Sequence, residues 1–589
     1  MKVILNSRNI SVLSVIIFAA LYLNRGFIDY ICWDVFGQYV YLPSAFINHT
    51  FYLPLEHFEV LNQHYHFSPT LYQFNVVDDI AYSKYTSGLA ILFIPFFLIG
   101  HLFASWLGYP LDGYSEPYSL AFWAGCFFYT ALNIFVLRKV LLIFFKDELV
   151  TWLVPILFFG TNLYAQSLIP STFTHNLAFL FVGFLLLSTK KFHDAPSLKT
   201  GLYLGISLGF LGLIRIPDLL LGIIPVLWDI KKYGSLKKKL LFFWSKKTAF
   251  FSVLISFMLI IGIQLTFWYS LTGHFFIDSY ATDPGGGFDW LRPHTLPFLF
   301  SFKKGWFIYT PLALLAIWGF VLLFKKKGNE QILAIAFLLF LYVVSTWTNW
   351  WYAESFSQRP MIDIYPIVGI AIGTLFLNVN RKFWLYLFTC FCIVLNVFQT
   401  WQMTAGIVSD SQMTRAYYFS TFGQLSPPTD LQIHLLEKAR SDYYDLSFED
   451  MNLQLLHTWK EEITDGQLNP EEAYTDDYYF DISEYYKEDK LYILRANWEF
   501  IPENSIILNG LMPNITTQYK GRSYEWRGGY EGSYDFSIDS LNHQIQMIYL
   551  VPHLRTKYDK IRVQVWNRDG IFITFSGLKV ELFEIIGRK

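Results

Sequence analysis

The sequence ISVLSVIIFAALYL, residues 10–23, and the polar stretch that follows it at residues 27–88 decide the fold. The first is an apolar run that can form a membrane helix, and the second is too polar to span a bilayer. The polar stretch contains WDVFGQY at residues 33–39 and SKYT at residues 83–86. We therefore expect one membrane helix followed by a large loop that carries a carboxylate at its start and a lysine at its end.

The composition is that of a polytopic membrane protein. Of the 589 residues, 53% are hydrophobic, 20% aromatic and 16% charged, a balance that no soluble globular class matches. Apolar runs of about 17 to 25 residues recur, long enough to cross about 30 Å of hydrocarbon as helices. A net charge of −2 argues against a nucleic-acid partner. The four cysteines indicate neither a disulfide framework nor a Cys-based metal site.

Lysines and arginines indicate which ends of the helices face the cytoplasm. They predict that the first span runs outward and delivers the loop 27–88 to the outer face. The lack of a clear small-x-small cleavage site and the many later spans favour a first helix that is retained over a cleaved signal peptide. The run Leu89–Leu107 is expected to be interfacial or re-entrant, because a full crossing would place the basic residues 138, 139 and 146 outside. Eleven spans then put the N-terminus inside and the C-terminus outside.

The expected spans alternate with basic clusters on the inner side. Leu202–Leu213 and Pro217–Trp228 are short, so a broken hairpin is an alternative for that pair. The spans after the first are Ser119–Ile143, Val150–Gln166, Thr172–Leu187, Leu202–Leu213, Pro217–Trp228, Phe250–Leu271, Trp306–Phe324, Ile332–Trp347, Met361–Leu377 and Phe383–Phe398.

The composition changes after about Gln402. Residues 430–463 are charged with helical apolar spacing, whereas short alternating runs at Leu491–Phe500, Gln544–Leu550 and Lys560–Trp566 predict strands. Turn signals occur at Pro513-Asn514, Gly528-Gly529 and Arg568-Asp569-Gly570. We therefore expect a transmembrane domain at 1–401, a helical connector at 402–477 and an extracytoplasmic β-sandwich-like domain at 478–589.

Several polar residues in apolar surroundings converge on the outer face in this topology. Asp34 is a candidate base and Lys84 a candidate anion holder, although both could be solvated charges at headgroup level. Arg215 and Arg359 are lone guanidinium groups beside Pro-containing breaks, and their fork suits a phosphate. Asp218 could simply pair with Arg215. The other polar residues at this face are His175, Lys303, Lys304, Ser355 and Gln358.

Four short motifs stand out in the first 400 residues. They are Trp33-Asp34 with Tyr39-x-Tyr41-Leu42-Pro43, Lys84-Tyr85-Thr86-Ser87-Gly88, Arg215-x-Pro217, and Glu354-Ser355-Phe356-Ser357-Gln358-Arg359. They resemble those of polytopic GT-C glycosyltransferases, in particular bacterial proteins akin to protein O-mannosyltransferases and aminoarabinose transferases of lipid A. The resemblance covers about residues 10–398.

The resemblance implies a mostly α-helical polytopic fold and an inverting transfer of one sugar from a polyprenyl-phosphate carrier. The acceptor would be a protein or glycolipid at the outer face of the bacterial cytoplasmic membrane. In this family an Asp of the first outer loop is the base, which corresponds to Asp34, and a Lys lies near the carrier phosphate, which corresponds to Lys84. We expect Arg215 and Arg359 to bind the same phosphate. Further candidate substrate contacts are Tyr39, Tyr85, His175, Lys303, Lys304, Ser355 and Gln358.

Two departures from the family pattern bear on a metal. Val35 and Ser83 stand where acidic neighbours are usual, and a second acidic residue of some members falls near His175. No cofactor is therefore assigned, and a divalent metal is left open.

An outward-facing transferase needs a lipid-delivered donor, because the space outside the membrane holds no nucleotide-sugar pool. The rival hypotheses are a transporter or flippase of a lipid-linked glycan, and a ligase that moves a whole glycan. A transporter would favour inverted halves with matched broken helices, and the sequence has no such symmetry.

Overall fold

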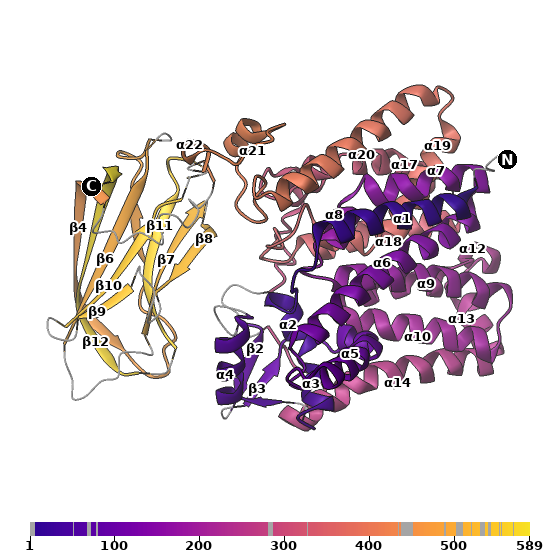
Figure 1. The fold of residues 1–589 in the computed structure, drawn as a ribbon, viewed down its shortest axis with the longest axis horizontal. Coiled ribbons are helices and arrows are strands. Elements are labelled where there is room, and N and C mark those ends of the chain that lie inside the picture. Colours follow the sequence, from indigo (N-terminus) through magenta and orange to yellow (C-terminus); the bar gives the residue numbers. More distant parts are fainter. Residues whose placement is uncertain are drawn as a thin grey trace. The chain divides into compact units, whose positions relative to one another are not determined.

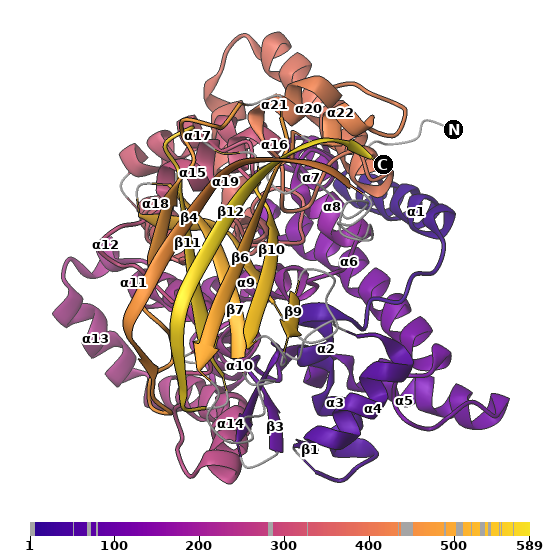
Figure 2. The same cartoon turned by 90° about the vertical axis from the view of Figure 1, so that its left-hand side faces the viewer.

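The computed structural model divides the chain into two compact units, Met1–Thr404 and Ala405–Lys589, which are described separately below (Figures 1 and 2). The structure describes residues 6–588 except 51, 68–71, 78–79, 281–286, 327, 434, 437–450, 488–489, 502–510, 520, 530–535, 540–542, 553, 555 and 569–570. The boundary between the units lies close to the expected end of the transmembrane domain at residue 401.

The first unit is built of helices, as its apolar runs predict. Most of them run across Figure 1. The main helices are α1 (Ser7–Arg25), α6 (Glu116–Phe144), α7 (Asp147–Phe159), α8 (Asn162–Leu168), α9 (Thr174–Asp194), α10 (Leu198–Ile214), α14 (Lys247–Thr272), α17 (Ala313–Lys326), α18 (Asn329–Ser345), α19 (Tyr365–Asn378) and α20 (Lys382–Thr404). Shorter helices are η1 (Ile216–Gly222), α11 (Ile223–Leu227), α12 (Ile230–Tyr233), α13 (Leu236–Ser245), α15 (Thr295–Phe300), α16 (Trp306–Tyr309) and η2 (Arg359–Ile362).

The mostly helical fold with several apolar spans is confirmed, but the count of eleven is not. Among the described residues, five helices are long and apolar enough to cross a membrane, or six if α7 and α8, bent by 59°, form one span. Proline accounts for two of the interrupted runs. Pro217 is the second residue of the 3₁₀ helix η1, which follows α10, and Pro311 lies between α16 and α17. Both breaks occur because proline cannot donate the helical hydrogen bond.

Helix α5 (Gly88–Leu107) corresponds to the run expected to be interfacial or re-entrant. It has the length and apolarity of a span. Figure 1 shows it almost end-on while α10 and α14 run across the picture, and Figure 2 shows it lengthwise. Its direction thus differs from that of α10 and α14, and its position relative to the bilayer stays a prediction.

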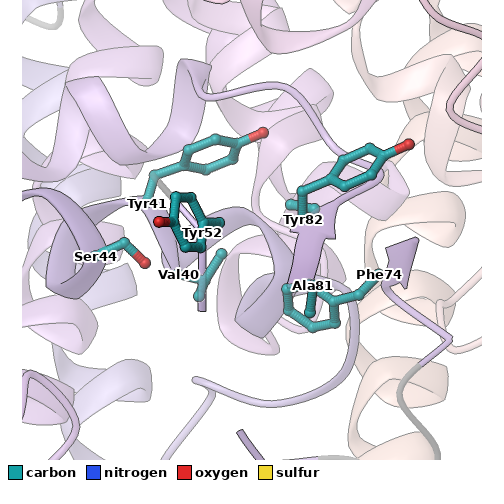
Figure 3. A pocket seen from close by; sticks show the side chains of 8 residues that line it. Val40, Tyr41, Ser44, Tyr52, Phe74, Ala81 and Tyr82 are labelled. Carbon is teal, nitrogen blue, oxygen red and sulfur yellow. The ribbon is translucent and has the colours of Figure 1, made fainter. Parts of the chain in front are cut away.

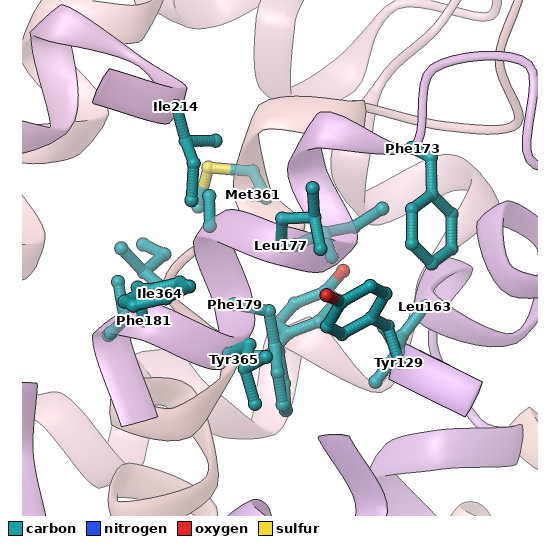
Figure 4. Packing of buried hydrophobic residues seen from close by; sticks show 14 of the residues in the cluster. Tyr129, Leu163, Phe173, Leu177, Phe179, Phe181, Ile214, Met361, Ile364 and Tyr365 are labelled. Carbon is teal, nitrogen blue, oxygen red and sulfur yellow. The ribbon is translucent and has the colours of Figure 1, made fainter. Parts of the chain in front are cut away.

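Small residues allow α10 and α14 to lie unusually close. A Cβ added at Gly201 would come within 1.9 Å of Ser252 Oγ, and one at Gly205 within 2.0 Å of Ser256 Oγ. Such spacing of small residues at four-residue intervals is typical of helix contacts in membranes. Within the core, Ile214 lies near Met361 and Leu177 (Figure 4), so that the end of α10 and the start of α9 meet the segment that carries η2.

The first loop folds into a compact subdomain. It contains α2 (Trp33–Tyr39), α3 (Tyr41–Phe46), α4 (Leu55–Tyr65) and a three-stranded sheet of order β1-β3-β2, with β1 at Leu53–Pro54, β2 at Phe74–Val77 and β3 at Ile80–Ser83. Phe36 stacks on Phe67 at 4.0 Å between ring centroids and fixes α2 in this core. A pocket between α3 and the sheet, lined partly by Tyr41 and Tyr82 (Figure 3), has a volume of about 10 Å³. That volume is about the room one water needs, so a sugar does not fit there.

The second unit confirms the predicted C-terminal β-rich region. Its sheets have the orders β4-β12-β6-β10-β9 and β5-β11-β7-β8, and side chains from both form one core, including Trp498 and Ile561. The elements are α21 (Arg415–Thr421), α22 (Asp430–Ile433), β4 (Met451–Leu468), β5 (Tyr478–Asp481), β6 (Tyr492–Ile501), β7 (Leu511–Tyr519), β8 (Arg522–Gly528), β9 (Phe536–Asp539), β10 (Gln544–Leu550), β11 (Lys560–Asn567) and β12 (Ile573–Arg588).

Two expectations for this unit are wrong. Residues 451–463 are not helical but belong to β4, whose register with β12 shifts at three places. These irregularities break the strict alternation, so that Leu456, Trp459 and Ile463 face the core with helix-like spacing. Residues 437–450 of the same prediction lie outside the described residues. The turn expected at Pro513-Asn514 is also wrong, since Pro513 lies within β7 and pairs with Val565 of β11.

Candidate active site

Asp34 forms the centre of a polar cluster at the start of α2. Its Oδ1 accepts hydrogen bonds from the hydroxyls of Tyr72 (2.8 Å) and Tyr85 (2.7 Å). Its Oδ2 accepts one from Nη2 of Arg359 at 3.0 Å. The side chains of Asp34 and Arg359 are only 16% and 15% exposed. The structure therefore joins the two ends of the first loop and the motif around residue 359 in one site.

The electrostatics of this cluster keep Asp34 ionised. Burial alone would raise the pKa of the Asp34 carboxyl, but the Arg359 guanidinium and the hydrogen bonds from Tyr85, Tyr72 and Arg359 bring it below the ordinary value of 3.8. Burial and the Asp34 charge raise the pKa of both tyrosines. Both phenols thus stay protonated and act as donors to the carboxylate.

The stretch Lys84-Tyr85-Thr86-Ser87-Gly88 positions Tyr85 through close backbone contacts. A Cβ at Gly37 would come within 2.7 Å of the Tyr85 ring, so the glycine makes room for it. A Cβ at Gly88 would come within 2.4 Å of the carbonyl oxygen of Leu213. Because glycine has no Cβ, the start of α5 can touch the end of α10. The Thr86 hydroxyl donates to the carbonyl of Ile214 at 3.3 Å. The motif therefore ties the Asp34 site to the break at Arg215.

The backbone is strained on both sides of the Asp34–Arg359 pair. Trp33, directly before Asp34, has φ 49°, and Tyr352, Glu354 and Ser357 have φ 43°, 59° and 59°. Residues other than glycine rarely adopt this left-handed region. Strained positions that cluster around one pair of charged side chains are typical of functional sites.

Lys303, Lys304 and Ser355 hold the strained loop in place. Nζ of Lys303 lies 4.5 Å from the ring centroid of Trp351, and Nζ of Lys304 donates to the carbonyl of Ser355. The Ser355 hydroxyl donates to the carbonyl of Tyr352 at 3.1 Å. The three residues predicted as substrate contacts therefore make contacts that position the loop before Arg359.

Gln358 is a different case within the same loop. Its side chain is 0% exposed, and neither its Oε1 nor its Nε2 has a hydrogen-bond partner among the described residues. Its carbonyl accepts from Nδ2 of Asn162 at 3.1 Å, so the backbone is held while the amide group is not. An unpaired buried amide is costly, and Gln358 directly precedes Arg359 in the chain.

A second charged cluster lies beside the first. Asp363 accepts from Arg215 through Oδ2 and contacts Nδ1 of His175 through Oδ1 at 2.8 Å. Nη1 of Arg215 is 3.6 Å from Oδ1 of Asp218. Asp218 and Asp363 are both 0% exposed. Because Asp363 follows directly after η2, which begins at Arg359, one short segment connects the two clusters.

Lys84 and Tyr39 are held by different contacts within the first loop. Lys84 is 6% exposed, and its backbone amide donates to the carbonyl of Gln73 at 2.9 Å. It directly precedes Tyr85. The Tyr39 hydroxyl donates to the carbonyl of Gly113 at 3.0 Å within the aromatic core of the loop. Tyr39 therefore supports α2 and is not joined to the Asp34 cluster by the contacts described here.

Sequence reasoning missed Asp363 and Tyr72. Asp363 lies within the apolar stretch Met361–Leu377 that was expected to span the membrane, and an ionisable residue in such a stretch is a functional candidate by default. That signal was present in the sequence. Tyr72 carried none, since it is one tyrosine among many in a polar loop.

The described residues contain no cluster of metal-ligating side chains. No group of three or more His, Cys, Asp or Glu side chains gathers there with the spacing a metal needs. Asp34 is engaged by tyrosines and arginine, and Asp363 by arginine and histidine.

No protein-family model matches the sequence, and no curated protein matches it. Among solved structures, the chain is similar to the crystal structure of the Archaeoglobus fulgidus oligosaccharyltransferase in complex with Zn and sulfate. The identity is 12% and the TM-score 0.36, over 70% of this chain and 54% of that one. The chain thus covers about half the length of this distant neighbour.

Proposed function

We propose that the chain transfers a sugar from a polyprenyl-phosphate donor to an acceptor hydroxyl at the outer face of the cytoplasmic membrane, with inversion at the anomeric carbon. The observation that carries the proposal is the ionised Asp34 carboxylate directly paired with Arg359. It supplies a base for the acceptor and a cation for the leaving phosphate within one hydrogen-bonded group.

Asp34 has room for one more donor. A carboxylate offers about four acceptor sites, and the tyrosines and Arg359 use three of them. The remaining lone pair on Oδ2 can accept a hydrogen bond from the hydroxyl of the molecule that receives the sugar. In the transfer, the acceptor oxygen bonds to the anomeric carbon, the bond from that carbon to the phosphate oxygen breaks, and the proton moves to Oδ2 of Asp34.

Arg359 can serve both reactants at once. A guanidinium has five N–H donors in a fixed plane, so one can remain on Asp34 while others bind a phosphate. Charge that develops on the leaving phosphate is stabilised by such preorganised donors. Lys84 is proposed as a second cation that binds the phosphate of the lipid-linked sugar donor. Arg215, which pairs with Asp363, is proposed to contribute through the adjoining cluster.

Gln358 and Tyr85 are proposed as substrate contacts. The buried amide of Gln358 lacks partners among the described residues, and a sugar hydroxyl could both donate to it and accept from it. Tyr85 already positions Asp34. His175, Lys303, Lys304 and Ser355 are proposed to position the site rather than to touch the sugar.

The test compares envelope glycolipids and glycoproteins from cells with and without the protein by mass spectrometry. We expect one sugar modification to disappear when the protein is absent and its lipid-linked donor to accumulate. Identical glycan profiles would contradict the proposal. A flippase would instead leave every downstream product of the carried glycan depleted, and a ligase would remove a whole glycan rather than one sugar.

A further inference from the structure

A cavity in the second unit is lined by residues of the four-stranded sheet and of its loops. It has a volume of about 530 Å³, and its lining residues come from β5, β7, β11 and the two segments next to β8 and β11. Cavities that bind small molecules usually have volumes of about 300 to 1,000 Å³. The lining residues are Tyr479, Gln518, Tyr519, Gly521, Thr556, Tyr558 and Lys560.

The lining combines aromatic rings with neutral hydrogen-bonding groups. Tyr479 is 49% exposed and Tyr558 67% exposed, so their rings are accessible at the cavity. A tyrosine ring offers an apolar face and a polar edge. A sugar ring has the matching character, with C–H groups on its faces and hydroxyls around its rim, and an amide such as Gln518 can both donate to and accept from those hydroxyls.

The charges beside the cavity are compensated. The hydrogen bonds from Ser483 lower the pKa of the Asp481 carboxyl, and the charge of Lys560, which stands opposite Asp481 in the strand pairing, lowers it further. Next to Lys560 on the same face, Arg562 lies 3.4 Å from Asp477. An anion would have to compete with these carboxylates, so an uncharged ligand fits the cavity better.

We propose that this cavity is a binding site for a neutral saccharide. One sugar unit stacks on the rings of Tyr479 and Tyr558, and its hydroxyls exchange hydrogen bonds with the amide of Gln518. The site lies wholly in the second unit and does not depend on the Asp34 chemistry.

The test uses the full-length protein in detergent. The probes are uncharged glucose, mannose and galactose oligomers of two to four units, screened on an array and then titrated by calorimetry. We expect at least one to bind, and Tyr479→Ala and Tyr558→Ala each to weaken it by about fivefold or more. Tyr558→Phe keeps the ring and should retain most of the affinity.

Phe572→Ala is the matched control, because Phe572 is another accessible ring of the unit, 36% exposed, outside the cavity lining. The Phe572→Ala variant should bind the saccharide with the affinity of the unsubstituted protein. The proposal is overturned if no oligomer binds, if both tyrosine-to-alanine variants bind unchanged, or if inorganic phosphate binds instead in a manner that Lys560→Gln abolishes. The Asp34→Asn variant should bind the saccharide with unchanged affinity although sugar transfer is lost. Saccharide binding and sugar transfer can therefore be tested independently of each other.

Discussion

Replacement of Asp34 by asparagine removes the proposed base with little change in shape. The side-chain oxygen of the introduced asparagine can still accept from Tyr72 and Tyr85, as Oδ1 of Asp34 does now at 2.8 and 2.7 Å. Its amide nitrogen then faces Nη2 of Arg359, where a charged hydrogen bond of 3.0 Å is lost. The variant therefore loses proton acceptance and one ion pair.

The two losses have different magnitudes. A positioned general base contributes roughly 10²- to 10⁴-fold, which corresponds to about 3 to 5 kcal/mol in the barrier. A hydrogen bond to a charged group contributes about 1.5 to 3 kcal/mol to stability, and here the partners are partly exposed, so the lower end applies. We expect kcat/KM to fall by at least 100-fold while the fold survives.

The assay measures kcat/KM for sugar transfer by purified protein in proteoliposomes that contain the lipid-linked donor, together with thermal unfolding. Asp29→Asn is the matched control, since Asp29 is another carboxylate of the same loop, bonded to Ser119 at 2.9 Å rather than to Arg359. Its activity should stay within a few-fold of the unsubstituted protein. Activity of Asp34→Asn within that same range, with an intact fold, would refute the assignment of the base.

The remaining predictions concern the cations, the second cluster and the topology. Arg359→Gln should raise the pKa of the base, so that the acid limb of the pH profile of kcat/KM, expected below the ordinary carboxyl value of 3.8, moves to higher pH; an unmoved limb would contradict the pairing. Lys84→Ala should raise the KM for the lipid-linked sugar donor about tenfold or more, and an unchanged KM would show that Lys84 does not bind that donor. Asp363→Asn breaks a buried pair and should cost about 3 to 5 kcal/mol of stability, seen as a lower unfolding temperature, whereas an unchanged temperature would show the pair to be dispensable. In a background without native cysteines, Ser441→Cys should react with an impermeant reagent in intact cells and Ser235→Cys only after lysis, and the opposite pattern would overturn the topology.

Much of the helical unit could be predicted from the sequence because hydrophobic length and proline are local signals.

Strands of the second unit could also be predicted. The strand expected at residues 544–550 is β10 itself, and the one at 560–566 is β11 within one residue. Fully buried residues alternate with less buried ones over the first part of each of these strands. In β4 the irregular register with β12 removes that alternation, so the local pattern imitates a helix.

The partners of the charged residues could not be predicted, because they depend on tertiary packing. Arg215 was expected to face a phosphate or Asp218, yet its closest carboxylate is Asp363, 148 positions later in the chain. Arg359 and Asp34 are 325 positions apart. Each pair forms only because α10, η2 and the first loop meet, which no sequence spacing encodes.

The central claim is that one sugar leaves a phosphate carrier and reaches an acceptor in a single step that needs Asp34. The direct measurement is the stoichiometry of free polyprenyl phosphate and glycosylated acceptor formed in proteoliposomes with purified protein, donor and acceptor. The account predicts that both products appear one for one, with inverted anomeric configuration, and that Asp34→Asn forms neither. Translocation of intact donor across the bilayer with no new glycosidic bond would contradict it.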